Sequence, residues 1–155
     1  MFVYGTLKRN QPNHHVLQTG GEGLAELGLN PRTFKPAKFL GAGHTISKYP
    51  LVIASKFNIP YLLDKSEIGH QIQGEIYEVN ETLLKILDDF EEHPNYYRRR
   101  EEEIEWKNCQ KIKCWVYFLP KFKEEMLKLE FLSDYNSIGD KAYCSEENIT
   151  NIEDI

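Results

Sequence analysis

The chain contains 155 residues, of which 41% are apolar and 28% are charged, and its formal net charge is −5. This length and composition predict one compact domain, over residues 1–155, with a hydrophobic core of its own. The negative charge supplies no basic field that could neutralise phosphates, so we expect no nucleic-acid partner. No stretch approaches the roughly 18 apolar residues of a membrane span, and the N-terminus lacks the features of a signal peptide. We therefore expect a cytoplasmic protein without a membrane partner.

The first dozen residues form the most informative segment. They predict a short apolar strand over residues 2–4, which ends at Gly5 before a polar turn that extends to Asn13. A loop between a strand and a following helix leaves backbone amides without partners, and such amides bind a carboxylate or a phosphate. The opening loop is therefore a candidate anion-binding site.

Strand patterns dominate the rest of the chain. Apolar or alternating runs predict strands over residues 39–40, 51–54, 61–63, 71–79, 104–106 and 111–119. Helical patterns are fewer and cover a short segment after Pro12, residues 80–91 and residues 120–129. Many short strands with few helices favour an α+β fold around a curled or closed sheet.

Charge and cysteine patterns indicate no further site. The three arginines of residues 98–100 are followed directly by the three glutamates of residues 101–103, a pattern typical of a solvated surface that compensates its own charge. The chain has 3 cysteines without C-x-x-C spacing, which disfavours a disulfide framework or a zinc site and predicts reduced thiols at Cys109, Cys114 and Cys144. The 5 histidines show no zinc-binding spacing either.

The predicted helix over residues 80–91 carries a carboxylate on its apolar side. Asn80 is a good N-cap, and a turn of about 100° per residue puts four apolar side chains on one arc, namely Leu83, Leu84, Leu87 and Phe90. Glu91 falls on the same arc, four residues after Leu87. Burial disfavours ionisation, so a glutamate here should have a raised pKa, as a general acid/base near neutrality requires.

Two other interpretations of Glu91 stay open at this point. The helix must stop near His93-Pro94, so Glu91 could lie past the last turn with its side chain in water. The neighbouring acids, Asp88, Asp89 and Glu92, could also suggest a cation site. Hard cations need oxygen ligands that converge from a loop, whereas this spacing spreads the carboxylates around a helix, so we expect no metal.

Several blocks of the sequence together form an uncommon combination. The blocks are residues 2–9 (FVYGTLKR), 11–14 (QPNH), 49–54 (YPLVIA), 58–63 (NIPYLL), 74–77 (GEIY) and 87–91 (LDDFE). They closely resemble the gamma-glutamylamine cyclotransferases, within the gamma-glutamyl cyclotransferase-like or AIG2-like superfamily. The blocks follow the family's order from residue 2 to about residue 100, with weaker similarity over residues 134–137.

The resemblance implies a small, mixed, barrel-like sheet with a few packed helices and a cavity covered by the first loop. It also implies a reaction in which a gamma-glutamyl amine, typically gamma-glutamyl-ε-lysine, closes into 5-oxoproline and releases its amine. Glu91 matches the single acid/base of the family. The substrate-binding loop of the family matches Tyr4, Gly5, Thr6 and Leu7, and further residues that match the site are Asn58, Ile59 and Tyr97.

This chemistry explains why no nucleophile motif is present. The α-amine of the substrate attacks its own side-chain carbonyl, so the benefit of proximity is built into the substrate. One carboxyl of raised pKa can move the protons, and loop amides can hold the α-carboxylate. We therefore expect no metal and no organic cofactor.

Residues 24–36 depart from the family pattern and resemble an insertion of about a dozen residues. Surface loops accept such insertions at a small cost in free energy. An ordered insertion could cover the cavity as a lid. We expect a monomeric enzyme with a small-molecule substrate. The alternative is a non-catalytic module of the same fold that uses the cavity to bind a small molecule or a protein.

Overall fold

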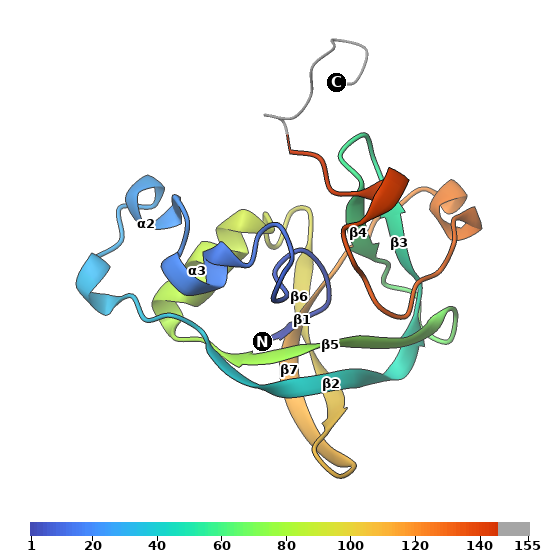
Figure 1. The fold of residues 1–155 in the computed structure, drawn as a ribbon, viewed down its shortest axis with the longest axis horizontal. Coiled ribbons are helices and arrows are strands. Elements are labelled where there is room, and N and C mark those ends of the chain that lie inside the picture. Colours follow the sequence, from blue (N-terminus) through green and yellow to red (C-terminus); the bar gives the residue numbers. More distant parts are fainter. Residues whose placement is uncertain (146–155) are drawn as a thin grey trace.

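A curled five-stranded antiparallel sheet forms the centre of the molecule (Figure 1). The structure is a computed structural model and describes residues 1–145. Along the sheet the strands follow the order β1 (Phe2–Val3), β5 (His70–Glu78), β2 (Lys38–Tyr49), β6 (Arg98–Trp106) and β7 (Gln110–Phe118).

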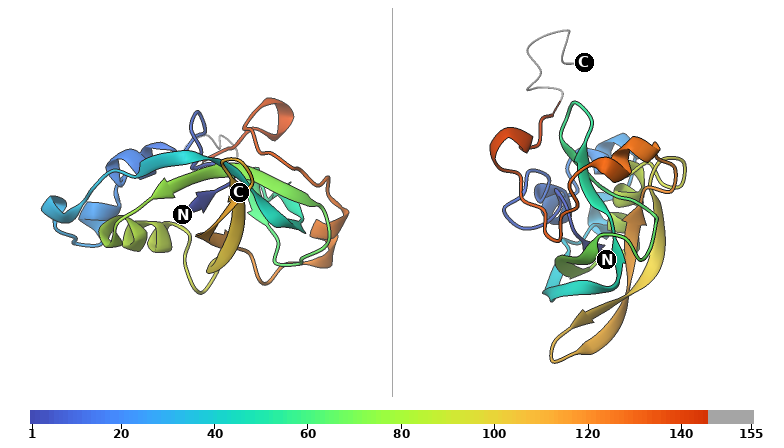
Figure 2. Two further views of the ribbon diagram at one scale, coloured as in Figure 1. Left: turned by 90° about the horizontal axis from the view of Figure 1, so that it is seen from below. Right: turned by 90° about the vertical axis from the view of Figure 1, so that its right-hand side faces the viewer.

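The sheet curls until its two edge strands approach each other. The Tyr4 hydroxyl, just after β1, donates a hydrogen bond of 2.7 Å to the carbonyl of Tyr117 on β7. Figure 1 shows the same curl, because β2 and β5 run across the view while β6 and β7 cross below them, and Figure 2 shows the concave side that results. The expected α+β fold with a barrel-like sheet is thus confirmed, in the form of a half barrel.

Strand β2 is much longer than the predicted residues 39–40. Glycine and polar residues interrupt its alternation, but it gains partners on both sides, since it pairs with β5 and with β6. Its register shifts between His44 and Lys48, where Thr45 Oγ1 accepts from the amide of Ile72 (2.8 Å) and donates to the carbonyl of Ser47 (2.7 Å). Tertiary pairing therefore extends a strand that its own sequence does not predict.

A separate hairpin of β3 (Leu51–Ala54) and β4 (Ile59–Leu62) stands beside the half barrel. Two isolated bridges connect it to the rest of the molecule. Leu51 pairs antiparallel with Leu132, and Leu63 pairs with Leu119 in parallel orientation. The turn of the hairpin contains two left-handed residues, Ser55 and Asn58.

Helix α3 (Glu81–Phe90) begins as predicted, because the Asn80 side chain accepts from the amide of Leu83 at 3.0 Å. The predicted apolar arc is wrong at one end, however. Ile86 is buried instead of Phe90, which is 41% exposed. The cause is the neighbouring segment, where Gly23 leaves room for Ile86: a Cβ atom at Gly23 would lie 2.7 Å from that side chain.

The other helices are short. They are α1 (His15–Thr19), α2 (Gly23–Glu26) and three 3₁₀ turns, η1 (Pro31–Thr33), η2 (Glu124–Lys128) and η3 (Gly139–Lys141). The predicted helix over residues 120–129 is therefore wrong except for η2. Five of the ten residues in this segment are charged, and its apolar residues Phe122, Met126 and Leu127 pack against the core from the short turn and its flanks. Within residues 1–145, the structure contains no helix with the length and apolar character that crossing a membrane requires.

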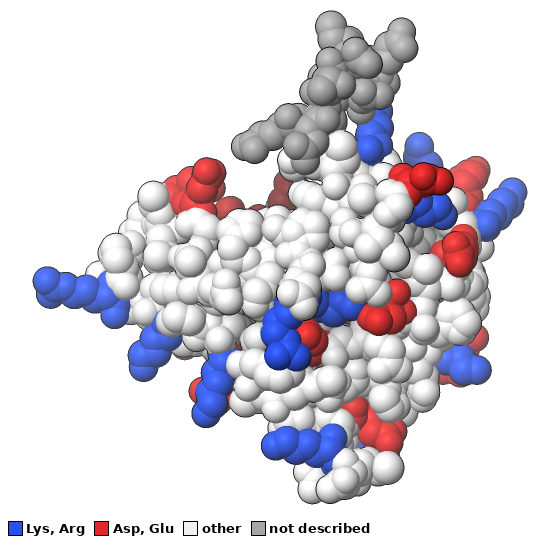
Figure 3. All heavy atoms as spheres, viewed as in Figure 1, with Lys and Arg blue, Asp and Glu red and all other residues white. Residues whose placement is uncertain are grey.

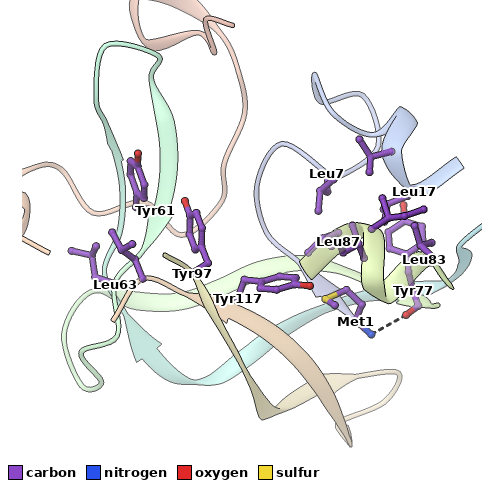
Figure 4. Packing of buried hydrophobic residues seen from close by; sticks show 14 of the residues in the cluster. Met1, Leu7, Leu17, Tyr61, Leu63, Tyr77, Leu83, Leu87, Tyr97 and Tyr117 are labelled. Carbon is purple, nitrogen blue, oxygen red and sulfur yellow. Dashed lines mark hydrogen bonds between the residues drawn. The ribbon is translucent and has the colours of Figure 1, made fainter. Parts of the chain in front are cut away.

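Residues 24–36 are ordered and pack beside α3. The carbonyl of Thr33 accepts from the Asn80 side chain (2.8 Å), and Leu24 and Phe34 lie against the core. Met1 and Tyr77 exchange two backbone hydrogen bonds of 2.9 Å, one of which is drawn in Figure 4, and so fix β1 against β5.

The arginine and glutamate runs form strand β6 and are not simply solvated. Arg99 forms an ion pair with Asp88 (2.8 Å) and its guanidinium lies 4.3 Å from the ring centroid of Trp115. Arg100 pairs with Asp64 (2.8 Å) and with Glu102 (3.0 Å), so only part of the compensation lies within the run. Elsewhere, Figure 3 shows acidic and basic side chains interspersed around the rim of the viewed face.

Candidate active site

A cavity of about 450 Å³ lies between the opening loop, the C-terminal end of α3 and the β3–β4 hairpin. Figure 1 shows these three segments next to one another, with the opening loop in the middle. The candidate residues that line the cavity are Tyr4, Gly5, Thr6, Leu7, Ile59, Glu91 and Tyr97. The structure thus brings the opening loop together with the hairpin and the end of α3, which lie much later in the sequence.

The opening loop uses its carbonyl groups internally and leaves amides free. The carbonyl of Gly5 accepts from the amide of Lys8 (3.1 Å), and that of Thr6 accepts from the amide of Asn13 (2.9 Å). Within residues 1–145, the amides of Gly5, Thr6 and Leu7 donate to no acceptor. Because they lie at the cavity, these three amides are suited to hold an anion.

Contacts with residues 134–137, in the C-terminal part of the chain, hold this loop in place. Lys8 is 7% exposed, and its ammonium donates to Asp134 and to the carbonyl of Tyr135, both at 2.6 Å. Gln11 accepts from the amide of Ser137 at 2.9 Å. These contacts give residues 134–137 a structural role and preorganise the loop before a ligand arrives.

Gly5 also sets the distance between the loop and the hairpin. A Cβ atom at this position would lie 2.9 Å from Cγ of Pro60, on β4. Such a distance is shorter than carbon atoms tolerate, so only glycine permits this approach of the loop.

Glu91 closes the C-terminal end of α3, and its amide donates to the carbonyl of Leu87 at 2.9 Å. Burial raises the pKa of its carboxyl from 4.5 to about 8. Among the described residues, no hydrogen bond or ion pair to this carboxyl is present, and the part of Glu91 that stays accessible lines the cavity. The carboxyl therefore occupies an apolar site and does not project into bulk water past the helix.

The raised pKa of Glu91 has a measurable effect on stability. Between pH 4.5 and pH 8 the folded state keeps a proton that the unfolded state releases, so stability falls as pH rises through this window. The solvent that reaches Glu91 through the cavity reduces the effect to about 2 kcal/mol.

We therefore expect the free energy of unfolding of the parent protein to fall by about 2 kcal/mol, relative to that of the Glu91→Gln variant, as the pH rises from about 5 to about 9. Urea unfolding of both proteins at each pH measures this difference and cancels the other titrating groups. A constant difference would contradict the raised pKa.

Tyrosines surround this carboxyl. Tyr97 stacks on Tyr61 with ring centroids 5.9 Å apart, and its hydroxyl donates to the carbonyl of Pro60 at 3.4 Å. Burial keeps the pKa of the Tyr4 and Tyr97 hydroxyls well above their usual value, so both stay neutral. Figure 4 shows Tyr97 beside Tyr61, with Tyr117 between this pair and the leucines of α3.

The other acid of the helix end has a structural partner. Asp88 accepts two hydrogen bonds from Arg99 (2.8 and 3.2 Å) and one from the Tyr117 hydroxyl (2.7 Å). This network ties α3 to β6 and β7. Among the described residues, no cluster of three or more histidine, cysteine or acidic side chains that could hold a metal ion is present.

Asn58 is not among the residues that line the cavity, so the structure gives no support to the expectation that it binds the substrate. Its backbone is left-handed (φ 53°), and its side-chain amide donates to the carbonyl of Ala142 at 3.0 Å. Several aromatic residues that no sequence pattern singles out also line the cavity, among them Phe57, Tyr96, Tyr117 and Tyr143. Only the tertiary fold brings these aromatic residues, which lie far apart in the sequence, to one place.

The sequence of this chain is similar to those of known proteins. The family model described as "Gamma-glutamyl cyclotransferase, AIG2-like" matches residues 1–137. The chain is 41% identical over 140 residues to the gamma-glutamylaminecyclotransferase of Bos taurus, which covers 90% of this chain and 76% of that protein. Its similarity to the gamma-glutamylaminecyclotransferase of Homo sapiens is 37% identity over 150 residues, with 90% of each chain covered.

A solved structure shows the same fold. The crystal structure of an AIG2-like protein from Mus musculus matches with a TM-score of 0.81 at 38% sequence identity, covering 96% of this chain and 97% of that chain. The chain therefore belongs to the gamma-glutamyl cyclotransferase, AIG2-like family of enzymes.

Proposed function

We propose that this enzyme converts a gamma-glutamyl amine, with gamma-glutamyl-ε-lysine as the preferred candidate, into 5-oxoproline and the free amine. One observation carries the proposal. Among the described residues, a carboxyl of raised pKa without a partner, Glu91, and a loop with three amides without acceptors, Gly5 to Leu7, line the same cavity. Its volume of about 450 Å³ lies in the range of small-molecule sites.

In the proposed complex, the amides of the opening loop hold the α-carboxylate of the substrate. This contact presents the α-amine to the side-chain carbonyl carbon of the same molecule. As the new C–N bond forms, ionised Glu91 takes a proton from the attacking nitrogen. Amides of the same loop also stabilise the negative charge that develops on the carbonyl oxygen.

The same carboxyl then completes the reaction. The bond between the carbonyl carbon and the leaving nitrogen breaks, and protonated Glu91 gives its proton to that nitrogen. The products are 5-oxoproline and a neutral amine, and Glu91 returns to its ionised form. A carboxyl with a pKa of about 8 suits both proton transfers near neutral pH, because neither its acid form nor its base form is rare there.

No protein nucleophile is required, because ring closure within one substrate has a high effective concentration of the amine. We also infer that a monomer is competent, since the loop, the hairpin and the helix end that build this cavity belong to a single chain.

The direct test is to incubate the purified protein with gamma-glutamyl-ε-lysine and to follow 5-oxoproline and lysine by mass spectrometry. We expect equimolar release of both products. The same substrate acetylated on the α-amine of its glutamyl group should give neither, because the attacking nitrogen is then blocked. Binding of the substrate without product formation would instead support the alternative of a non-catalytic binding module. If the protein also releases no 5-oxoproline from related gamma-glutamyl amides, the proposed reaction is wrong.

A further inference from the structure

Residues 140–145, which we term the C-terminal strap, close one wall of the cavity. Tyr143, Cys144 and Ser145 of the strap all line it. The strap lies outside residues 1–137, to which the family model matches. Figure 1 shows this segment, in red, beside the β3–β4 hairpin.

Hydrogen bonds to the hairpin turn and to Ser137 fix the strap in position. The Asn58 side chain donates to the carbonyl of Ala142 (3.0 Å), and the amide of Cys144 donates to the carbonyl of Phe57 (2.8 Å). The amide of Tyr143 donates to the hydroxyl of Ser137 at 2.7 Å. Asn58 can make its contact because its left-handed backbone turns the side chain away from the cavity and toward the strap.

The β3–β4 hairpin contacts both the opening loop and the strap, at different residues. Pro60 meets the opening loop at Gly5, whereas Phe57 and Asn58 meet the strap. Pro60 lies on β4 whereas Phe57 and Asn58 lie in the turn of the hairpin, so the loop and the strap contact different parts of the hairpin. Since the loop takes the glutamyl end of the substrate, the strap faces the other end.

We propose that the strap, together with Phe57, forms the subsite for the leaving amine and makes the enzyme prefer long alkylamines over short ones. This inference rests on the proposed function of the same cavity. Phe57 and Tyr143 supply aromatic surface on which an alkyl chain can pack. Among the described residues no lysine or arginine lines the cavity, so the subsite offers no partner to an amine that carries only a negative charge.

Two variants test the subsite by kinetics. Asn58→Gly keeps the left-handed backbone accessible but removes the contact to Ala142, and Tyr143→Ala removes the aromatic wall. With gamma-glutamyl-ε-lysine we expect the KM of each variant to rise about tenfold while kcat stays unchanged, as loss of uniform binding energy requires. With gamma-glutamyl methylamide, which is too short to reach the strap, we expect both constants to stay unchanged.

Equal losses on the two substrates would show a general structural role for the strap, and unchanged KM values would show that it does not contact the amine. Either result overturns the proposal. Activity of the parent protein on the methylamide separates these outcomes from a failure of the proposed function.

A second test needs no turnover. Cys144 lines the cavity, while Cys109 is exposed and Cys114 is buried. In the Cys109→Ser, Glu91→Gln double variant, we expect gamma-glutamyl-ε-lysine to slow the alkylation of Cys144 by iodoacetamide at least fivefold and the methylamide to leave it unchanged. If both compounds protect Cys144 equally, or if neither does, the strap is not an amine subsite, whatever the activity of the parent.

Discussion

Replacing Glu91 with glutamine is expected to lower kcat on gamma-glutamyl-ε-lysine about 1000-fold, within the range found for the loss of a general acid/base. Glutamine has the same shape but can neither accept the proton of the α-amine nor give one to the leaving nitrogen. Because the carboxyl lies in an apolar site and has no partner among the described residues, the fold should survive the change. Release of 5-oxoproline under saturating substrate measures the effect.

The matched control for this variant is Asp89→Asn, which removes one carboxylate from the same helix. Asp89 is exposed and its side chain does not line the cavity, so we expect its kcat to stay within about twofold of the parent value. Far-UV circular dichroism of both variants checks that α3 is intact. A Glu91→Gln enzyme with parental kcat, or an equal loss in Asp89→Asn, would remove Glu91 from the mechanism.

The sequence predicts this part of the site well because its signals are local. The N-cap at Asn80 fixes where α3 begins, and the spacing from Leu87 puts Glu91 at the end of the same helix. The opening loop is equally local, since the short strand, Gly5 and the polar turn follow one another directly. Family membership is confirmed, whereas the catalytic role of Glu91 stays a prediction.

Features that depend on tertiary contacts could not be predicted in the same way. The buried face of α3 includes Ile86 because Gly23 leaves space for it, and no helical periodicity contains that information. Strand β2 exists because two neighbouring strands pair with it. The sequence pattern predicts that Asn58 contacts the substrate, whereas the structure shows its side chain bound to the strap. The direction of this side chain depends on a backbone conformation that the sequence does not specify.

The ion-pair partners of the arginines of residues 98–100 could not be predicted from the sequence either. Charge patterning alone predicts a solvated surface, because Arg98 to Arg100 precede the three glutamates directly. In a strand, however, successive side chains point to opposite faces. Arg99 consequently reaches Asp88 on α3, a partner that charge patterning along the sequence does not suggest.

Replacing Gly5 with alanine is expected to lower kcat/KM about 100-fold, the scale on which a displacement of about 1 Å affects a positioned substrate. The added methyl group would lie 2.9 Å from Cγ of Pro60 and must push the opening loop away from the hairpin. The amides of Gly5, Thr6 and Leu7 would then no longer converge on the α-carboxylate. The Lys8 contacts to Asp134 and Tyr135 keep the rest of the loop in place, so the loss should arise at the site and not from unfolding.

The control for this prediction is Gly41→Ala on β2, where an added methyl group meets only the side chain of Trp106, at 3.3 Å and beyond, outside the cavity. We expect this variant to keep kcat/KM within about twofold, as substitutions away from a site usually do. Adding Pro60→Ala to Gly5→Ala removes the Cγ atom that causes the clash. The double variant should have a kcat/KM about tenfold higher than Gly5→Ala alone. Full activity in Gly5→Ala would show that the loop does not bind the substrate through its amides. If the double variant has the same kcat/KM as Gly5→Ala, the clash with Pro60 is not the cause of the loss. The methyl group would then block the anion site itself.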